Sequence, residues 1–152
     1  MDEYIAAAGE SAPQALRKCR ETSARIESEM FRRKGPSRVL IGMCLPANFR
    51  VVESDARALA RLSGARLALG CKLHRLKTGQ WPQSLADLQK AFPERFKELP
   101  NDPFTGQPFV YKLTDKGCLV YSVGPDGKDD GGAAYDSKTR AVNYDLVFEL
   151  KK

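Results

Sequence analysis

Hydrophobic and polar positions follow a helical period over two long stretches of the chain. The first runs from Ser11, a suitable N-cap, to about Arg33 and has Pro13 in its first turn. Its apolar and small residues recur at spacings of three and four: Leu16, Cys19, Ser23, Ile26 and Met30. This narrow stripe predicts a helix that docks on the rest of the domain or on a partner, since such a helix is marginal alone.

The second stretch runs from Ser54 to Thr78 without a proline and ends at Gly79, a candidate C-cap. Its leucines recur at spacings of three, four and seven, with Leu67 beside them, and form what we call the leucine stripe: Leu59, Leu62, Leu69, Leu73 and Leu76. The pattern predicts a long amphipathic helix. Two interior glycines, Gly64 and Gly70, reduce helix propensity by up to about 1 kcal/mol each, and we expect them to permit close approach of another element.

The pattern is less regular elsewhere. Residues 39–49 are apolar but interrupted by a glycine and a proline, and they indicate neither strand nor helix. After Gly79, a short helix is expected from Ser84 to about Ala91. The stretches 108–114 and 118–123 predict a hairpin, and 143–150 alternate as a last strand.

Together these elements predict an α+β fold in which one long helix packs on a three-stranded antiparallel sheet. Residues 1–50 would form an N-terminal helical extension and linker, and residues 51–152 the domain itself. A length of 152 residues suits one main folded unit that needs no disulfides.

Composition limits the chemistry. The chain has one histidine and four cysteines without a CxxC pair, so Ser-His-Asp and Cys-His catalysis, multi-histidine zinc sites and a four-cysteine zinc knuckle are disfavoured. We expect His74 at the surface or edge of its helix and the cysteines as small buried side chains, with disulfides left open. These observations favour a protein that is not an enzyme.

The N-terminal residues and the longest apolar stretch provide evidence on the cellular location of the protein. The longest apolar run, Val39 to Leu45, is shorter than the roughly 18–20 residues of a membrane span. The acidic first ten residues do not resemble a secretory signal. We therefore expect either an intracellular protein or one whose targeting segment lies outside this sequence.

The net charge of +6 is unevenly distributed. The second helix carries six basic residues and no acidic one between its first and last: Arg57, Arg61, Arg66, Lys72, Arg75 and Lys77. They fit a module that binds nucleic acid or anionic lipid, or a solvated face opposite the leucine stripe, which we favour. No nucleic-acid motif accompanies them.

Acidic residues gather near the C-terminus, in a segment rich in glycine. Asp126, Asp129, Asp130 and Asp136 fall within eleven residues, and Asp145 begins the last strand. Carboxylates held this closely repel one another unless they are solvated or neutralised by a hard cation such as Ca²⁺. The spacing does not match an EF-hand, and no Walker loop supports Mg²⁺-dependent phosphoryl chemistry. From these residues alone, a solvated acidic turn and a calcium site both remain open.

Several short motifs follow one another along the chain in an order that is typical of a known family. The long helix leads to Gly79-Gln80-Trp81-Pro82, a short helix, Asp102-Pro103-Phe104, the hairpin, and Tyr121 to Gly127 with the sequence YSVGPDG. From about Ala56 to Phe148 the chain resembles the C-terminal domain of the major pseudopilin of type II secretion systems. It also resembles uncharacterised bacterial proteins with an SVGPDGKDDGG loop. Residues 1–50 have no counterpart in this resemblance.

The resemblance implies a non-enzymatic structural domain in bacterial protein transport, extracytoplasmic or anchored at the inner membrane. Its partners would be other protein subunits, including copies of itself, and nucleic acid is not expected. The corresponding loop of the family binds Ca²⁺. Carried onto this chain, the resemblance implies as Ca²⁺ ligands the backbone carbonyl of Val123, the carboxylates of Asp126 and Asp145, and further carboxylates among Asp129, Asp130 and Asp136.

Overall fold

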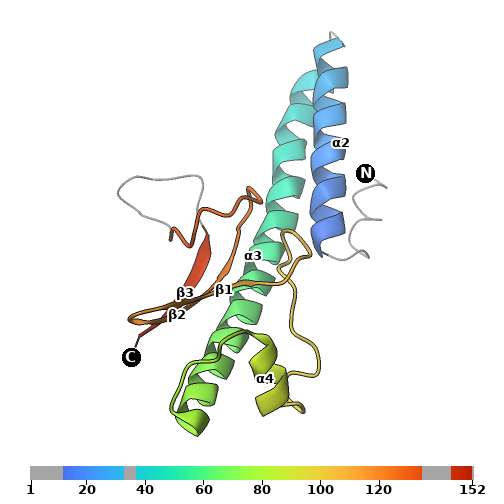
Figure 1. Cartoon of the computed structure of the whole chain (residues 1–152). Coiled ribbons are helices and arrows are strands. Elements are labelled where there is room, and N and C mark those ends of the chain that lie inside the picture. Colours follow the sequence, from blue (N-terminus) through green and yellow to red (C-terminus); the bar gives the residue numbers. More distant parts are fainter. Residues whose placement is uncertain (1–11, 33–36, 135–144, 152) are drawn as a thin grey trace. The chain divides into compact units, whose positions relative to one another are not determined.

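A computed structural model describes residues 12–32, 37–134 and 145–151 (Figure 1). The chain forms two compact units, Met1–Arg57 and Ala58–Lys152, and one helix belongs to both. Within the described residues the elements are α2 (Ala12–Arg32), α3 (Ser37–Thr78), α4 (Ala86–Ala91), β1 (Val110–Thr114), β2 (Gly117–Ser122) and β3 (Leu146–Lys151). The predicted α+β class, with helices and a three-stranded antiparallel sheet, is confirmed.

The first unit pairs α2 with the beginning of α3, and Figure 1 shows the two helices running alongside each other. Ala15 and Cys19 of α2 are buried, and Val52 of α3 packs against them. The predicted α2 stripe therefore does bury Leu16 and Cys19, which are 3% and 1% exposed. The ion pair between Arg17 and Glu21 is exposed and contributes little to stability.

Helix α3 is longer than the pattern predicted, because the unassigned residues 39–49 are helical as well. Gly42 and Pro46 lower helix propensity by about 1 and about 3 kcal/mol relative to alanine, and α3 continues through both positions in spite of this local cost. At the other end, the Gly79 N–H donates to the Arg75 carbonyl at 2.7 Å, and Gly79 has φ of 79°, as expected of a C-cap. No helix in the described ranges is both long and apolar enough to cross a membrane.

The sheet of the second unit has the order β1-β2-β3 with both pairs antiparallel. Val110 pairs with Tyr121 at one end of the hairpin, and Thr114 pairs with Gly117 at the other. The third strand pairs along all of β2, from Ser122 opposite Leu146 to Gly117 opposite Lys151. The hairpin and last strand are thus confirmed, with β2 at the buried centre of the sheet.

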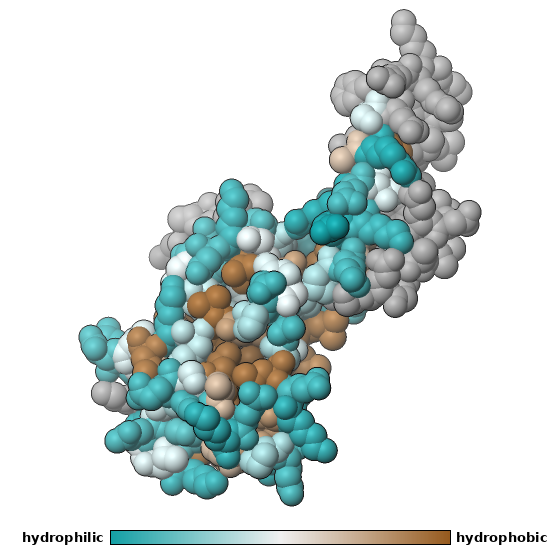
Figure 2. Space-filling model, turned by 45° about the vertical axis from the view of Figure 1, so that its right-hand side comes forward, coloured by the Kyte–Doolittle hydropathy of each residue, from teal (hydrophilic) through white to brown (hydrophobic). Residues whose placement is uncertain are grey.

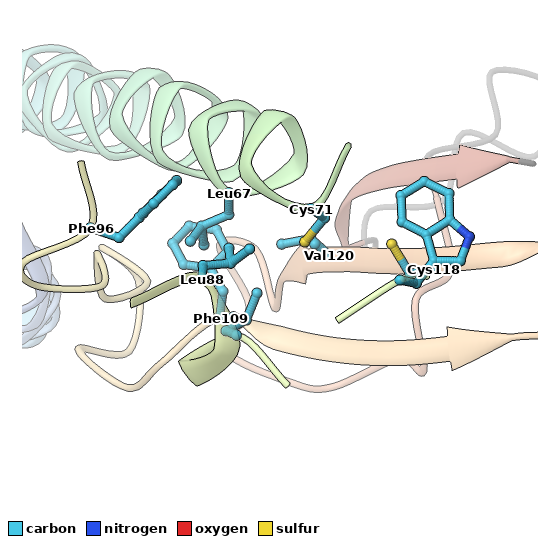
Figure 3. Close-up of a cluster of buried hydrophobic side chains, with 9 residues drawn as sticks. Leu67, Cys71, Leu88, Phe96, Phe109, Cys118 and Val120 are labelled. Atoms are coloured by element: carbon cyan, nitrogen blue, oxygen red, sulfur yellow. The ribbon is translucent and has the colours of Figure 1, made fainter. Parts of the chain in front are cut away.

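The core of the second unit lies between α3, α4 and the sheet (Figure 3). Its buried members are Leu67, Cys71, Trp81, Leu85, Leu88, Phe96, Phe109, Cys118 and Val120. Two glycines of α3 allow aromatic rings to approach the helix backbone. A Cβ on Gly70 would lie 2.6 Å from Phe96 Cζ, and one on Gly64 would overlap the Phe148 ring. The expected close approach at Gly64 and Gly70 is confirmed.

The leucine stripe does not enter this core. Its five residues are exposed by 42%, 72%, 66%, 36% and 74% in chain order, whereas Leu67 is fully buried. The buried face of α3 instead carries Ala60, Gly64, Leu67 and Cys71. Leu69 and Cys71 are two positions apart and so point about 200° away from each other. The expectation that the face opposite the leucines would be the solvated one was therefore wrong. Figure 2 shows that hydrophobic side chains reach the surface on one face of the second unit.

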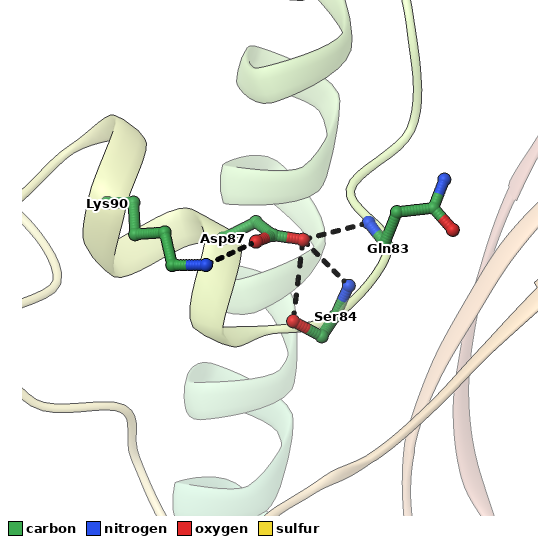
Figure 4. Close-up of polar contacts among 4 residues, drawn as sticks. All are labelled: Gln83, Ser84, Asp87 and Lys90. Atoms are coloured by element: carbon green, nitrogen blue, oxygen red, sulfur yellow. Dashed lines mark hydrogen bonds and ion pairs between the residues drawn. The ribbon is translucent and has the colours of Figure 1, made fainter.

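Helix α4 is held at its start by one carboxylate (Figure 4). Asp87 Oδ2 accepts hydrogen bonds from the backbone N–H groups of Gln83 and Ser84, both at 3.0 Å. These bonds, the Ser84 N–H first, lower the pKa of Asp87 below its usual range. Lys90 lies 3.3 Å from Oδ1. The carboxylate thus satisfies N–H groups that precede a helix of a single turn and a half.

The single histidine contacts the backbone at the end of α3, and the described cysteines are buried. Thr78 Oγ1 donates to the His74 carbonyl at 2.9 Å, and His74 Nδ1 lies 3.1 Å from the Gln80 carbonyl, so the imidazole belongs to the helix end. Cys19, Cys71 and Cys118 are buried. Burial raises the pKa of the Cys71 thiol to about 12, which leaves it protonated and unreactive at neutral pH.

A substitution of Gly64 tests the contact between α3 and β3. Gly64→Ala should lower the free energy of unfolding by up to about 2 kcal/mol, because overpacking costs roughly 1–3 kcal/mol and the gain in helix propensity offsets only about 1 kcal/mol of it. Adding Phe148→Leu should restore part of the loss by removing the ring that the new methyl group meets. Urea unfolding measures both. A more stable Gly64→Ala protein would contradict the close packing.

Candidate functional site

The aspartate-rich segment connects the central strand to the last one. It leaves β2 at Val123 and returns at Asp145, immediately before β3. Ala134 and Asp145 form a parallel bridge, and the Asp145 N–H donates to the Ala133 carbonyl at 2.8 Å. We call residues 123–134 and Asp145 the Asp/Gly loop. Residues 133–134 are therefore joined to Asp145 by backbone hydrogen bonding.

Glycines give the loop its turns. Gly124, Gly127, Gly131 and Gly132 have φ between 72° and 88°, a region that side-chain-bearing residues rarely adopt. Aspartates close two of the turns, since Asp126 Oδ1 accepts from the Lys128 N–H at 3.2 Å and Asp129 Oδ1 from the Gly131 N–H at 2.9 Å. Sequences of Asp and Gly favour such turns because the side chain takes the place of a backbone acceptor.

A buried carboxylate outside the loop fixes where it begins. Asp102 is 2% exposed and lies in the turn before β1. Its carboxylate accepts bonds from the Ser122 hydroxyl and the Val123 N–H, each at 3.0 Å, and from the Phe104 N–H at 2.9 Å. The Asp102-Pro103-Phe104 motif entered the resemblance, but sequence reasoning did not identify Asp102 as part of the site. A carboxylate followed two residues later by a backbone N–H that it can bond was the available signal.

Tyr121 connects the loop to the sheet. The residue is fully buried, and its hydroxyl donates to Asp129 Oδ1 at 2.8 Å. The ring lies 5.1 Å from Lys112 Nζ, measured to the ring centroid. The Gly131 N–H first, then the Tyr121 hydroxyl and the positive charge of Lys112, lower the pKa of Asp129 below its usual range. Asp129 is thus ionised and already has two donors.

Two carboxylate oxygens of the loop lack any hydrogen-bond partner although they are buried: Asp126 Oδ2 and Asp145 Oδ1. Asp145 is 1% exposed, and its other oxygen accepts from the Gly132 N–H at 2.7 Å. A buried carboxylate oxygen without a hydrogen-bond partner lowers the free energy of unfolding by about 1–3 kcal/mol or more, a cost that a solvated oxygen does not have. Their chemistry fits an oxygen-binding cation such as Ca²⁺.

The charge of Asp145 is unfavourable in the absence of a cation. Burial raises the pKa of its carboxyl above the usual value, and the negative charges of Asp129 and Asp130 add to the rise. Hydrogen bonds from the backbone N–H groups of Gly132 and Asp130 oppose this shift without cancelling it. The negative charges of Asp129 and Asp130 therefore repel an ionised Asp145.

The candidate ligands are distributed along the loop. Val123, Asp126, Asp129, Asp130 and Asp145 all belong to it, and Asp136 lies outside the described residues. Within the described part of the chain, no three His, Cys, Asp or Glu side chains come close enough to form a metal cluster. An ion in this loop would therefore need backbone carbonyl oxygens beside the carboxylates, which is common for calcium.

The basic residues of α3 make contacts with their own chain. The Arg66 guanidinium bonds the Arg95 carbonyl and lies 5.3 Å from the Phe96 ring centroid. Lys77 Nζ donates to the Ala91 carbonyl at 3.2 Å and lies over Phe92. Further contacts of this kind join Lys72 and Arg75 to the Trp81 ring, and an ion pair joins Arg57 to Glu53. Much of the predicted basic surface thus has an intramolecular role.

Comparisons with known proteins add no relative. No protein-family model, curated protein or solved structure matches the chain.

Removing the Asp102 carboxylate should destabilise the second unit strongly. Asp102→Ala leaves the Ser122 hydroxyl and the Val123 N–H without an acceptor, and we expect a loss of about 3 kcal/mol or more in the free energy of unfolding. Asp115→Ala, in the exposed turn between β1 and β2, is the matched control and should change it by less than about 0.5 kcal/mol. Similar losses in both variants would contradict the anchoring role.

The raised pKa of Asp145 predicts a pH dependence in metal-free protein. Between the ordinary aspartate pKa of about 3.9 and the higher folded value, the folded state holds a proton that the unfolded state has released. Rising pH therefore lowers the free energy of unfolding across this window. Asp145→Asn should lack this decline, so the difference between variant and unsubstituted protein should move in favour of the variant from about pH 4 upward.

Chemical unfolding at several pH values in the presence of a chelator measures this difference. A constant difference across the window would mean that Asp145 is not a strained carboxylate.

Proposed function

We propose that the second unit is a non-enzymatic interaction domain, similar to the C-terminal domain of a type II secretion pseudopilin, whose Asp/Gly loop binds Ca²⁺. The observation that carries the calcium proposal is the pair of buried, unpartnered oxygens, Asp126 Oδ2 and Asp145 Oδ1. A solvated acidic turn would leave such oxygens to water. Their burial at the beginning and end of one loop supports a cation instead.

Each proposed ligand has a reason in the loop. Asp126 and Asp145 offer the unpartnered oxygens, and Val123 offers a carbonyl at the point where Asp102 holds its N–H. Asp130 adds negative charge near Asp145. Asp129 is a weaker candidate, because Tyr121 and Gly131 already bond one of its oxygens. Calcium tolerates such a mixed and irregular set of carboxylates and carbonyls, whereas Mg²⁺ demands near-octahedral geometry.

The proposed role of the ion is structural. Bound Ca²⁺ would offset the repulsion among Asp129, Asp130 and Asp145 and join the end of β2 to the start of β3. The surroundings of His74 also support a non-enzymatic protein, since this single histidine of the chain lies against the backbone at the end of α3. A role in protein transport and partners among other protein subunits follow from the pseudopilin resemblance and belong to the same proposal.

The nucleic-acid alternative has no observation that favours it over this proposal. Four basic side chains of α3 lie over aromatic rings of the same unit, and those rings are therefore not free to stack on bases.

Calcium should stabilise the protein measurably. Metal-free protein titrated with CaCl₂ should gain about 2.7 kcal/mol at 100 times the dissociation constant, seen as a rise in Tm. Asp126→Ala and Asp145→Asn should each remove most of this gain, since each deletes one of the unpartnered oxygens. Differential scanning calorimetry and isothermal titration measure the rise in Tm and the binding.

Asp115→Ala is the matched control, because it removes an exposed carboxylate outside the loop and should keep the full calcium response. An unchanged Tm at millimolar Ca²⁺, or a rise that survives both loop substitutions, would rule out the calcium site.

A further inference from the structure

Five of the seven exposed large hydrophobic residues in the described part of the chain belong to the leucine stripe. Its five leucines are between 36% and 74% exposed, on the side of α3 that faces away from the sheet. Isolated exposed leucines are ordinary, but a row of five along one helix, interrupted only at Arg66, indicates an interaction surface. All five lie in the second unit, which begins at Ala58.

The spacing of the stripe suits another helix. Leu59, Leu62, Arg66, Leu69, Leu73 and Leu76 follow at intervals of three, four, three, four and three, so they occupy successive a and d positions of a heptad register. This seam is narrow. A helix that lies on a membrane needs a broader apolar face with aromatic side chains, whereas an a/d seam packs into the holes of a facing helix.

The basic residues at and beside the seam indicate the charge of the partner. Arg66 takes one a position, and Lys72 and Lys77 take the flanking g and e positions. Aromatic rings hold these groups beside the seam: Phe96 under Arg66, Trp81 under Lys72 and Phe92 under Lys77. From Arg57 to Lys77 the helix has no acidic residue, and the neighbouring segment 94–98 carries two acidic and two basic residues, so the sign stays positive.

A second copy of the chain fits this surface poorly. In a parallel pair, Arg66 would face its own equivalent and Lys72 would lie beside the Lys77 equivalent. In either direction, each helix would bring the positive charges of Arg66, Lys72 and Lys77 to a seam that has no negative charge between Arg57 and Lys77. Like charges across such a seam are destabilising and select against self-pairing.

We propose that the leucine stripe of α3 binds an acidic amphipathic helix of another protein, with leucine-like residues at a and d and carboxylates facing Arg66, Lys72 and Lys77. This inference rests on the interaction part of the proposed function and is independent of the calcium part. The positioned cations select the partner's charge, and the leucines supply the apolar surface that the partner buries.

A designed peptide tests the surface on the full chain. The probe is a three-heptad helix with leucine at a and d and glutamate at e and g, and its matched counterpart has lysine in place of glutamate. Fluorescence anisotropy should show binding of the glutamate peptide only, and about 1 M NaCl, with a Debye length near 3 Å, should weaken it at least about tenfold.

Substitutions locate the binding. Leu62→Gln with Leu69→Gln should weaken the glutamate peptide about tenfold or more, while Leu113→Gln, an exposed leucine of β1, should not. Lys72→Glu with Lys77→Glu should transfer the preference to the lysine peptide. Because all these side chains are exposed, each variant should keep a cooperative unfolding transition and so show that it folds, with Tm lowered in the lysine double variant only by the loss of the contacts that Lys72 and Lys77 make with Trp81, Phe92 and the Ala91 carbonyl.

Four results would overturn the proposal: no binding of the glutamate peptide; equal binding of both peptides; self-association lost in the leucine double variant; or binding of phosphatidylglycerol vesicles, but of neither peptide, that the same variant loses. Binding in chelator and in Ca²⁺ is compared throughout. Asp126→Ala should retain peptide binding, which separates a failed calcium site from a failed helix surface.

Discussion

The packing of the second unit depends on how small the sheet-facing side chains of α3 are. Gly64 lets the Phe148 ring approach the helix backbone, Gly70 does the same for Phe96, and Cys71 lies beside Cys118 in the same core. A leucine at Gly64 or Cys71 would hold the sheet away, and one at Gly70 would displace Phe96 and Leu88. Apart from Leu67, the larger apolar residues of α3 between Ala58 and Thr78 are therefore on the opposite side, which explains why an apolar row remains exposed.

The same sheet carries the Asp/Gly loop, and its two ends are fixed by different means. Asp102 bonds the chain as it leaves β2, and Asp145 bonds Gly132 and Ala133 as the chain enters β3. Between them the glycines permit turns that other residues resist. The loop thus combines well-held ends with unsatisfied carboxylate oxygens, and the proposed calcium site rests on this combination.

Much of this could be predicted from sequence. Periodicity located α2, the later part of α3, the hairpin and the last strand, because each has a strong local pattern. It assigned the wrong face to α3, since hydrophobic spacing counts leucines and overlooks that Gly64 and Cys71 make room for rings distant in sequence. It missed Asp102 for a related reason: its partners Ser122 and Val123 are about twenty residues away and only the sheet brings them together.

The two thiols in the helix–sheet core have a kinetic consequence. Cys71 and Cys118 come from α3 and β2, and both lie fully buried in one cluster, where burial favours the protonated thiol. Alkylating reagents attack the solvated thiolate, so neither can react while helix and sheet stay together. Their modification therefore requires a local opening, and its rate reports the free energy of separating α3 from the sheet under native conditions.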